Sequence, residues 1–320
     1  MVNTTRYPAI LAVALMTNIA ASGEVVFELS TPYHHIRVIE DGGVRSLNFN
    51  DAVQTRLSVA NPVQGHFEYI EYFFTPWLWN SGITNALMLG LGGGSAQRLF
   101  QHYAPAVKID TVEIDSRVVR VARDFFSVQP SEMHRIHIAD ARVFLRRSPT
   151  RYDAIFADAY VSGRYGCSLP QHLATKEFLT LANDHLTTNG VMVYNVVGTL
   201  GGAQADIVGA VHRTMKAVFP QVYLFPAKES QNVVLVATKA KHKVNLPSIR
   251  WKAGELARTQ RVKLPGFVER VGTFQADPPA SFAKSPVLTD DYAPVEGLAA
   301  SPEAKRQAAP EAEHALDPSH

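Results

Sequence analysis

The segment LMLGLGGGSAQRL, residues 87–99, decides the fold of this chain. It places an apolar run, a cluster of glycines and a helix-compatible stretch in direct succession. Glycines at the end of a buried strand let the backbone approach a ligand closely. The first turn of a following helix directs its free amide groups at the same point. We therefore expect a ligand-binding loop formed by Gly90, Gly92 and Gly94.

Downstream of this loop, apolar runs alternate with segments of helical period. The strand-like runs are KIDTVEID, RIHIAD, YDAIFADAY, GVMVYNVVG, VYLFPA and NVVLVATK. Helices are expected near residues 95–104, 116–126, 174–185 and 203–218. Strands separated by helix-length segments predict an α/β protein with a doubly wound, mostly parallel sheet.

The last two strand-like runs are separated by only about six residues, AKESQN (227–232). A parallel crossover needs about a dozen residues or more, so the final strand must pair antiparallel, as a hairpin. A Rossmann-like sheet of seven strands with an antiparallel last strand is typical of class I S-adenosylmethionine-dependent transferases. A simple dinucleotide-binding domain would not require that strand.

The remainder of the chain suggests additions to this sheet. Short alternating runs from Val25 to about Trp79 predict a small antiparallel β domain over 24–80, with Asp41-Gly42-Gly43 as a hairpin turn. The nucleoside-binding domain is expected over 81–240. A C-terminal extension over 241–298 is expected to pack on it.

The two ends differ from the middle. Residues 1–23 include the apolar run PAILAVALMTNIAASG, which resembles a signal peptide in length and is too short to span a bilayer. A cleaved leader, a membrane anchor and a packed N-terminal segment all stay open, and membrane contact is expected only for an anchor. Residues 299–320 contain few large apolar side chains and predict a disordered tail.

Composition excludes several classes of function. The formal net charge is +2 over 320 residues, and no run of Lys or Arg exceeds a pair, so nucleic acid is not an expected partner. The single cysteine, Cys167, excludes an internal disulfide framework and a CxxC metal site. The histidines show no ligand spacing, and we expect no metal.

Acidic residues end three successive predicted strands. Glu113 lies 23 residues after Gly90, near the spacing of a carboxylate that binds ribose hydroxyls. Asp140 and Asp158 end the next two strands. Any one of these acids could simply cap a helix. Together with the glycine loop they predict a nucleoside site at the carboxyl edge of the sheet.

The order of these motifs resembles the spermidine synthase family, the polyamine aminopropyltransferases, in its spermidine-synthase-like bacterial branch. The resemblance covers roughly residues 24–298. It is carried by the segments STPYHHIRVIEDGGVRSLNFNDAVQ, FEYIEYFFTP, LMLGLGGGSAQRLF, TVEIDSRVVRVARDFF, ADARVFL, YDAIFADAY, LPQHLATKEFLTLANDHLTTNGVMVYNVVG and VLTDDYAPVEGL.

The resemblance implies a reaction and its residues. An aminopropyl group would pass from decarboxylated S-adenosylmethionine, a co-substrate rather than a tightly bound cofactor, to an amine such as putrescine. Asp158 would be the catalytic carboxylate, and Tyr69 would shape the amine pocket. The nucleoside contacts would come from Gln54, the glycine loop, Glu113, Asp140 and Ala141. A homodimer through the N-terminal sheet and a cytoplasmic location would follow.

The amine end departs from the family pattern. The resemblance places aspartates where this chain has Gly93 and Val161. Glu71 and the pair Asp290 and Asp291 are candidates to restore the missing negative charge, although the pair could instead cap a turn or bind arginines.

A gate over the crevice is also expected. Tyr160, which we also assign to the amine pocket, begins the segment YVSGRYGCSLPQ (160–171) between a strand end and a helix. Cys167 lies within this segment and is expected to be a bystander.

Alternative functions stay open beside aminopropyl transfer. Loss of the loop aspartate favours an S-adenosylmethionine-dependent methyltransferase. A non-catalytic nucleoside or amine binder is a second alternative, and a dinucleotide oxidoreductase is a third.

Overall fold

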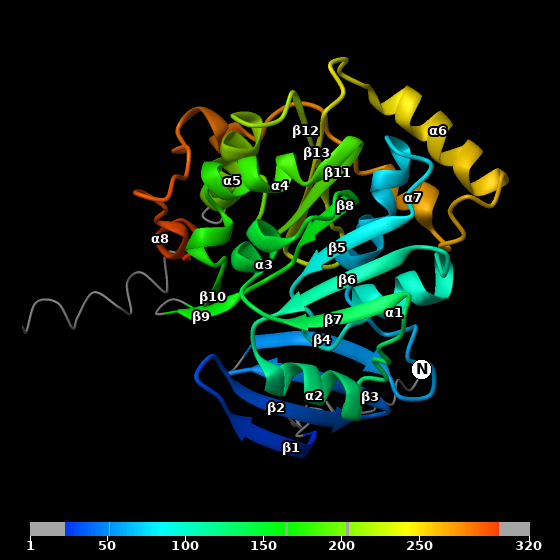
Figure 1. Cartoon of the computed structure of the whole chain (residues 1–320), viewed down its shortest axis with the longest axis vertical. Coiled ribbons are helices and arrows are strands. Elements are labelled where there is room, and N and C mark those ends of the chain that lie inside the picture. The colour runs from blue at the N-terminus through cyan, green and yellow to red at the C-terminus, as the bar shows by residue number, and fades with distance from the viewer. Residues whose placement is uncertain (1–22, 51, 164–165, 203–204, 301–320) are drawn as a thin grey trace, which may run out of the picture.

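The structure is a computed structural model that describes residues 23–50, 52–163, 166–202 and 205–300. The expected leader and tail lie outside these ranges, apart from Gly23 and residues 299–300. A four-stranded sheet and a seven-stranded sheet form the frame (Figure 1). Within the described ranges, no helix has both the length and the apolar character required to cross a bilayer.

The N-terminal sheet is an antiparallel meander. Its strands are β1 (Glu24–Ser30), β2 (His35–Asp41), β3 (Val44–Phe49) and β4 (Ala52–Ser58). The expected turn at Gly42 and Gly43 is confirmed, with φ values of 54° and 79° that suit a tight hairpin. Val38 and Leu47 share a buried cluster with Val118 of α2 (Ser116–Phe125), which lies against this sheet in Figure 1.

The main sheet has the strand order β12-β13-β11-β8-β5-β6-β7. Its strands are β5 (Asn85–Leu89), β6 (Lys108–Glu113), β7 (His134–Ile138), β8 (Tyr152–Ala157), β11 (Leu186–Val197), β12 (Gln221–Pro226) and β13 (Asn232–Thr238). The pairs from β11 through β7 are parallel, and β13 is antiparallel to both β11 and β12. The predicted fold class is confirmed. The antiparallel strand, however, lies inside the sheet, and β12 forms the edge.

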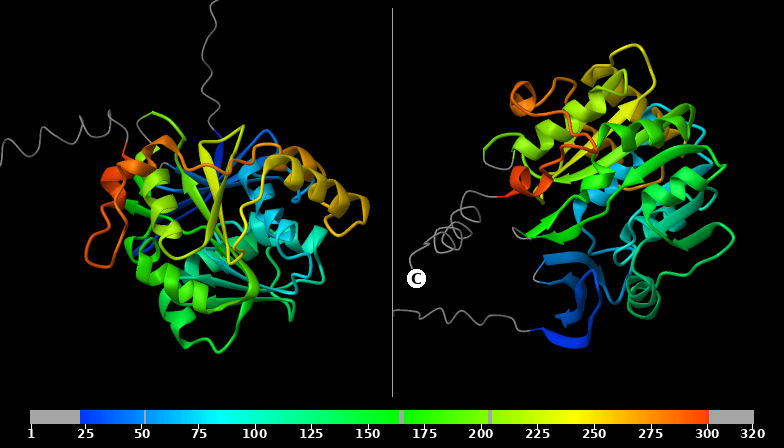
Figure 2. Two further views of the ribbon diagram at one scale, coloured as in Figure 1. Left: turned by 90° about the horizontal axis from the view of Figure 1, so that it is seen from above. Right: turned by 60° about the vertical axis from the view of Figure 1, so that its left-hand side comes forward.

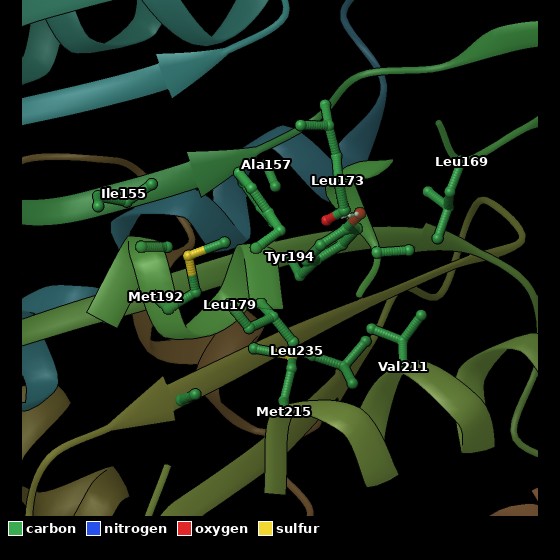
Figure 3. Close-up of a cluster of buried hydrophobic side chains, with 14 of the residues drawn as sticks. Ile155, Ala157, Leu169, Leu173, Leu179, Met192, Tyr194, Val211, Met215 and Leu235 are labelled. Atoms are coloured by element: carbon green, nitrogen blue, oxygen red, sulfur yellow. Dashed lines mark hydrogen bonds between the residues drawn. The ribbon is translucent and has the colours of Figure 1, made fainter. Parts of the chain in front are cut away.

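Helices cover both faces of the main sheet (Figure 2). On one face, Leu179 of α4 (Lys176–Asp184) and Met215 of α5 (Ala205–Lys216) share a buried cluster with Met192 of β11 (Figure 3). Burial of each such side chain contributes about 1.5–3 kcal/mol. The other face is covered by η1 (Glu68–Leu78), α1 (Ser95–Tyr103), α6 (Leu246–Arg258) and α7 (Phe267–Val271). Shorter elements are α3 (Ala141–Arg147), η2 (Gln171–Leu173), η3 (Ala280–Ala283) and α8 (Val295–Ala299).

The four expected helices are confirmed as α1, α2, α4 and α5, the last within its described part. The expectation of strands up to Trp79 is wrong beyond Ser58, because residues 68–78 form the helix η1. This helix packs on the main sheet and on α1, with Phe73 against Phe156 of β8 and Phe74 against Phe100 of α1. The suggested domain boundaries remain predictions.

Candidate active site

A cavity of about 600 Å³ opens at the carboxyl ends of β5, β6 and β8. Residues of β4, including Gln54 and Thr55, close it from the side of the N-terminal sheet. This volume accommodates a nucleoside-sized ligand, and strand ends of an open α/β sheet are the usual place for one.

The glycine loop follows β5. Gly90 and Gly92 line the cavity, whereas Gly94 does not: a β-carbon at Gly94 would lie 2.2 Å from Cγ2 of Val128. Gly90 has φ 101°, and a β-carbon there would lie 2.2 Å from the carbonyl oxygen of Asp158. Only glycine fits this close approach of two strand ends. Gly92 and Gly94 also have positive φ, and α1 begins directly after them.

Arg98 of α1 stabilises this loop through hydrogen bonds to backbone carbonyl oxygens. Its buried guanidinium donates to the carbonyl oxygens of Gly93, Phe126 (2.8 Å) and Pro62 (3.1 Å). Burial lowers the pKa of Arg98 to about 10, so the group is still charged at neutral pH. Sequence reasoning missed this role, because a buried arginine looks like any polar residue on a helix.

Glu113 ends β6 beside the loop and lines the cavity. Its Oε2 accepts the Leu91 N–H at 3.1 Å, and its Oε1 accepts the Asp115 N–H at 2.9 Å. Burial raises the pKa of the Glu113 carboxyl, and these two backbone amides oppose the rise. Each oxygen keeps a second lone pair that can accept a ligand hydroxyl.

Asp140 follows β7 and caps α3. Its Oδ1 accepts the Val143 N–H at 2.8 Å, and its Oδ2 lies 2.8 Å from Nε2 of His172. The helix-capping alternative is therefore realised at this residue. Asp140 and Ala141 nevertheless both line the cavity, next to Glu113.

Asp158 follows β8 on the other side of the glycine loop. Its Oδ1 accepts Nδ2 of Asn195 at 2.8 Å, and its Oδ2 accepts the hydroxyl of Tyr69 at 3.2 Å. Burial raises the pKa of the Asp158 carboxyl to about 6, and these two hydrogen bonds oppose the rise. Burial, with the nearby Asp158 charge, also raises the pKa of Tyr69, which keeps its proton as a donor.

The hydrogen-bond chain continues across the sheet edge from Asp158. Asn195 of β11 accepts Nδ2 of Asn232, at the start of β13, through its own Oδ1 at 3.0 Å. Tyr160 donates its hydroxyl to the Asn195 carbonyl at 3.0 Å and accepts the Val197 N–H at 2.8 Å. This side of the cavity is thus lined by amides and phenols.

Packing against β4 explains why residue 93 is a glycine. A β-carbon there would lie 2.6 Å from Cγ2 of Thr55, and the Gly93 N–H donates to Thr55 Oγ1 at 2.9 Å. Thr55 of β4 therefore fills the space that a side chain at position 93 would need. Gln54, its neighbour in the chain, lines the cavity and donates to Sγ of Cys167 at 3.5 Å.

The expected gate segment forms a short hairpin of β9 (Val161–Gly163) and β10 (Gly166–Ser168). Residues 164–165 at its tip lie outside the described ranges. Val161 and Cys167 line the cavity, and burial raises the pKa of the Cys167 thiol. A thiol held in its protonated form is a poor nucleophile, which agrees with a bystander.

Glu68 is a further residue that sequence reasoning missed. Its carboxylate is buried, and its Oε2 accepts the backbone N–H groups of Lys228 (2.8 Å) and Glu229 (2.6 Å). Its Oε1 lies 2.9 Å from Nη1 of Arg270. Glu68 thereby fixes the turn between β12 and β13, whose next residues, 230–232, line the cavity.

The structure does not bring Glu71, Asp290 or Asp291 into the cavity. Glu71 pairs with Arg270 at 2.7 Å and with His66 at 3.2 Å. Asp290 binds Arg142 through two contacts of 2.7 Å and 2.6 Å and, with Asp291, borders a second cavity of about 540 Å³. The expected compensation by these acids is wrong, because arginines already neutralise two of the carboxylates outside the site.

Solved structures with this fold identify its class. A probable spermidine synthase from Corynebacterium glutamicum ATCC 13032 is 19% identical, with a TM-score of 0.59, over 72% of this chain and 87% of that chain. Human Methyltransferase-like protein 13, solved in complex with SAH, is 25% identical, with a TM-score of 0.52, over 61% of this chain and 93% of that chain. The chain thus has the Rossmann-like methyltransferase fold.

The sequence comparisons identify the family within this class. The model of the spermine/spermidine synthase domain matches residues 75–247. The polyamine aminopropyltransferase of Vibrio vulnificus (strain CMCP6) is 30% identical in an alignment of 243 residues that covers 71% of this chain and 78% of that protein. The chain belongs to the spermine/spermidine synthase family.

Proposed function

We propose that this protein transfers an aminopropyl group from decarboxylated S-adenosylmethionine to an amine. The observation that carries this proposal is the half-buried carboxylate of Asp158, held by Asn195 and Tyr69 directly beside the glycine loop. A carboxylate in that position can orient an amine and take its proton. Membership of the family supports the same reaction.

The donor would lie across β5, β6 and β7. Glu113 would accept hydrogen bonds from the ribose hydroxyls, and Asp140 with Ala141 would contact the adenine. Gln54 and the glycine loop would contact the remainder of the nucleoside. Apart from Gly94, these residues line the same cavity, and the sulfonium would then face Asp158.

The chemical step is a displacement at carbon. The lone pair of a neutral amine attacks the aminopropyl carbon bound to sulfur, and the electrons of the C–S bond pass to the sulfonium. Neutral 5′-methylthioadenosine leaves, and the new nitrogen centre carries an extra proton. Asp158 accepts this proton directly. Only the ionised carboxylate can do so, and with a pKa of about 6 Asp158 is mostly ionised above pH 6.

Methyl transfer is a second candidate, and a specific observation favours it. Thr55 occupies the space beside Gly93, so the donor end lacks a carboxylate that would bind the terminal ammonium of a decarboxylated donor. The human structure that shares this fold was solved with SAH. The absence of a carboxylate at position 93 suits the zwitterionic tail of ordinary S-adenosylmethionine better.

Product analysis separates the two candidates. The protein is incubated with an amine panel that includes putrescine, once with decarboxylated S-adenosylmethionine and once with S-adenosylmethionine. Aminopropyl transfer gives 5′-methylthioadenosine and an acceptor heavier by an aminopropyl group. Formation of S-adenosylhomocysteine with a methylated amine, and no methylthioadenosine, would contradict the proposal.

A further inference from the structure

The acceptor end of the cavity differs from the donor end in charge. Three carboxylates line the cavity among the described residues: Glu113, Asp140 and Asp158. The strand order places Glu113 and Asp140 on β6 and β7, on the far side of the glycine loop. Asp158 alone is on the side of β8, β11 and β13.

Beyond Asp158, the sheet edge presents neutral groups. Asn195 and Asn232 bond to each other, and Asn195 bonds to Asp158, so their amides are fixed in direction. Ser230 and Gln231 continue this wall from the turn that Glu68 holds in place. A second ammonium here would be desolvated without a carboxylate partner, which is unfavourable.

Two further details favour an uncharged tail. The hydroxyl oxygen of Ser230 is buried and has no hydrogen-bond partner among the described residues. The ring of Phe67, which lines the cavity, already carries the guanidinium of Arg56 at 4.4 Å from its centroid. One face of that ring is therefore already covered by a cation from within the chain.

We propose that the acceptor is a primary monoamine with a short uncharged tail that ends in a hydroxyl or carbonyl group, and is not an α,ω-diamine. The reactive amine meets Asp158, the tail lies along the amides of Asn195 and Asn232, and its polar end bonds to Ser230. This inference rests on the proposed aminopropyl transfer. It replaces putrescine, the acceptor implied by the family resemblance.

The test compares acceptors of equal chain length. Release of 5′-methylthioadenosine from decarboxylated S-adenosylmethionine is followed with 4-amino-1-butanol, butylamine and putrescine. We expect kcat/KM for 4-amino-1-butanol to exceed that for putrescine by about 10-fold to 100-fold, because only putrescine buries an unpaired charge. A higher value for putrescine would overturn this inference and leave the proposed function intact. Absence of methylthioadenosine with every amine would instead overturn the proposed function.

A pair of matched variants sharpens the test. Ser230→Asp adds a carboxylate at the neutral end, and Ser230→Asn adds a side chain of similar size without charge. We expect Ser230→Asp, and not Ser230→Asn, to shift the ratio of the two kcat/KM values toward putrescine by about 10-fold or more. An equal shift in both variants, or no shift in either, would contradict a role of charge. Thermal unfolding of both variants confirms that the fold is retained.

Discussion

Across the glycine loop, the rim of the cavity changes from acidic to neutral. On β6 and β7 it presents Glu113 and Asp140, whereas on β11 and β13 it presents Asn195 and Asn232. Asp158 stands at the border between these two halves. Under our proposals, the acidic half binds the hydroxyl and amino hydrogens of a nucleoside, and the neutral half binds a nearly uncharged acceptor tail. On this account, the site keeps the donor chemistry of the family and changes its acceptor.

The border residue gives the largest expected effect. Asp158→Asn removes the proton acceptor and keeps a side chain of the same shape, so turnover is expected to fall by about 10²-fold to 10⁴-fold. Affinity for 5′-methylthioadenosine should change little. Steady-state rates and calorimetry measure the two quantities. Unchanged turnover would exclude Asp158 as the proton acceptor.

The turn that carries part of the neutral half is held by the ion pair of Glu68 with Arg270. Glu68→Ala leaves Arg270 without one of its partners and frees the amides of Lys228 and Glu229. We expect the free energy of unfolding to fall by about 3–5 kcal/mol. Chemical denaturation measures it. Glu255→Ala, which removes an exposed helix pair with Arg258, is the control and is expected to leave the free energy of unfolding nearly unchanged.

The acidic half is tested through donor affinity. Glu113→Gln removes the charge of an acceptor that also orders Leu91 and Asp115. We expect the Kd for 5′-methylthioadenosine to rise by about 10-fold to 100-fold, because hydrogen bonds to charged groups are the stronger kind. Calorimetry measures this Kd, and the thermal midpoint serves as the folding control. A rise below threefold would remove Glu113 from the nucleoside site.

The pKa of Asp158 predicts a smaller effect on stability. Its folded-state pKa of about 6 lies above the ordinary 3.8, so the native state binds more protons than the unfolded state between these values. Ionisation of Asp158 therefore lowers the stability of the wild-type protein as pH rises through this range, and Asp158→Asn lacks this contribution. We expect the variant to be more stable by about 1–3 kcal/mol above pH 6 and equal to wild type near pH 4. Denaturation at several pH values measures the difference, and a constant offset at all pH values would contradict it.

The same ionisation should control turnover. Asp158 must be ionised to accept a proton, so kcat is expected to rise as pH increases through about 6. The free amine fraction rises with pH as well, but around the much higher pKa of the amine. A pH profile without an inflection near 6 would separate Asp158 from the proton transfer.

The sheet could be predicted from sequence because it depends on local spacing. The short gap between the runs of β12 and β13 determines their antiparallel pairing. It does not determine that β13 inserts beside β11, since that choice depends on burial of a strand apolar along its whole length. Helix α6 was missed, although Asn245 and Ser248 form a capping box at its start.

Spacing alone predicted the site only where its residues end strands, and the family resemblance added Gln54 and Tyr69, which also line the cavity. Glu113, Asp140 and Asp158 meet because parallel strands share one carboxyl edge. The partners of Glu71 and Asp290 could not be foreseen, because Arg270 and Arg142 are distant in sequence and no local pattern signals such pairs. The hydrogen bonds that Glu68 and Arg98 make to distant backbone groups were missed for the same reason.

A crystal structure with bound 5′-methylthioadenosine tests the division of the cavity most directly. The account expects the ribose hydroxyls at Glu113, the adenine beside Asp140 and Ala141, and the sulfur facing Asp158. The space along Asn195, Asn232 and Ser230 should stay open for the acceptor. A nucleoside that instead occupies the amide-lined half would contradict the account.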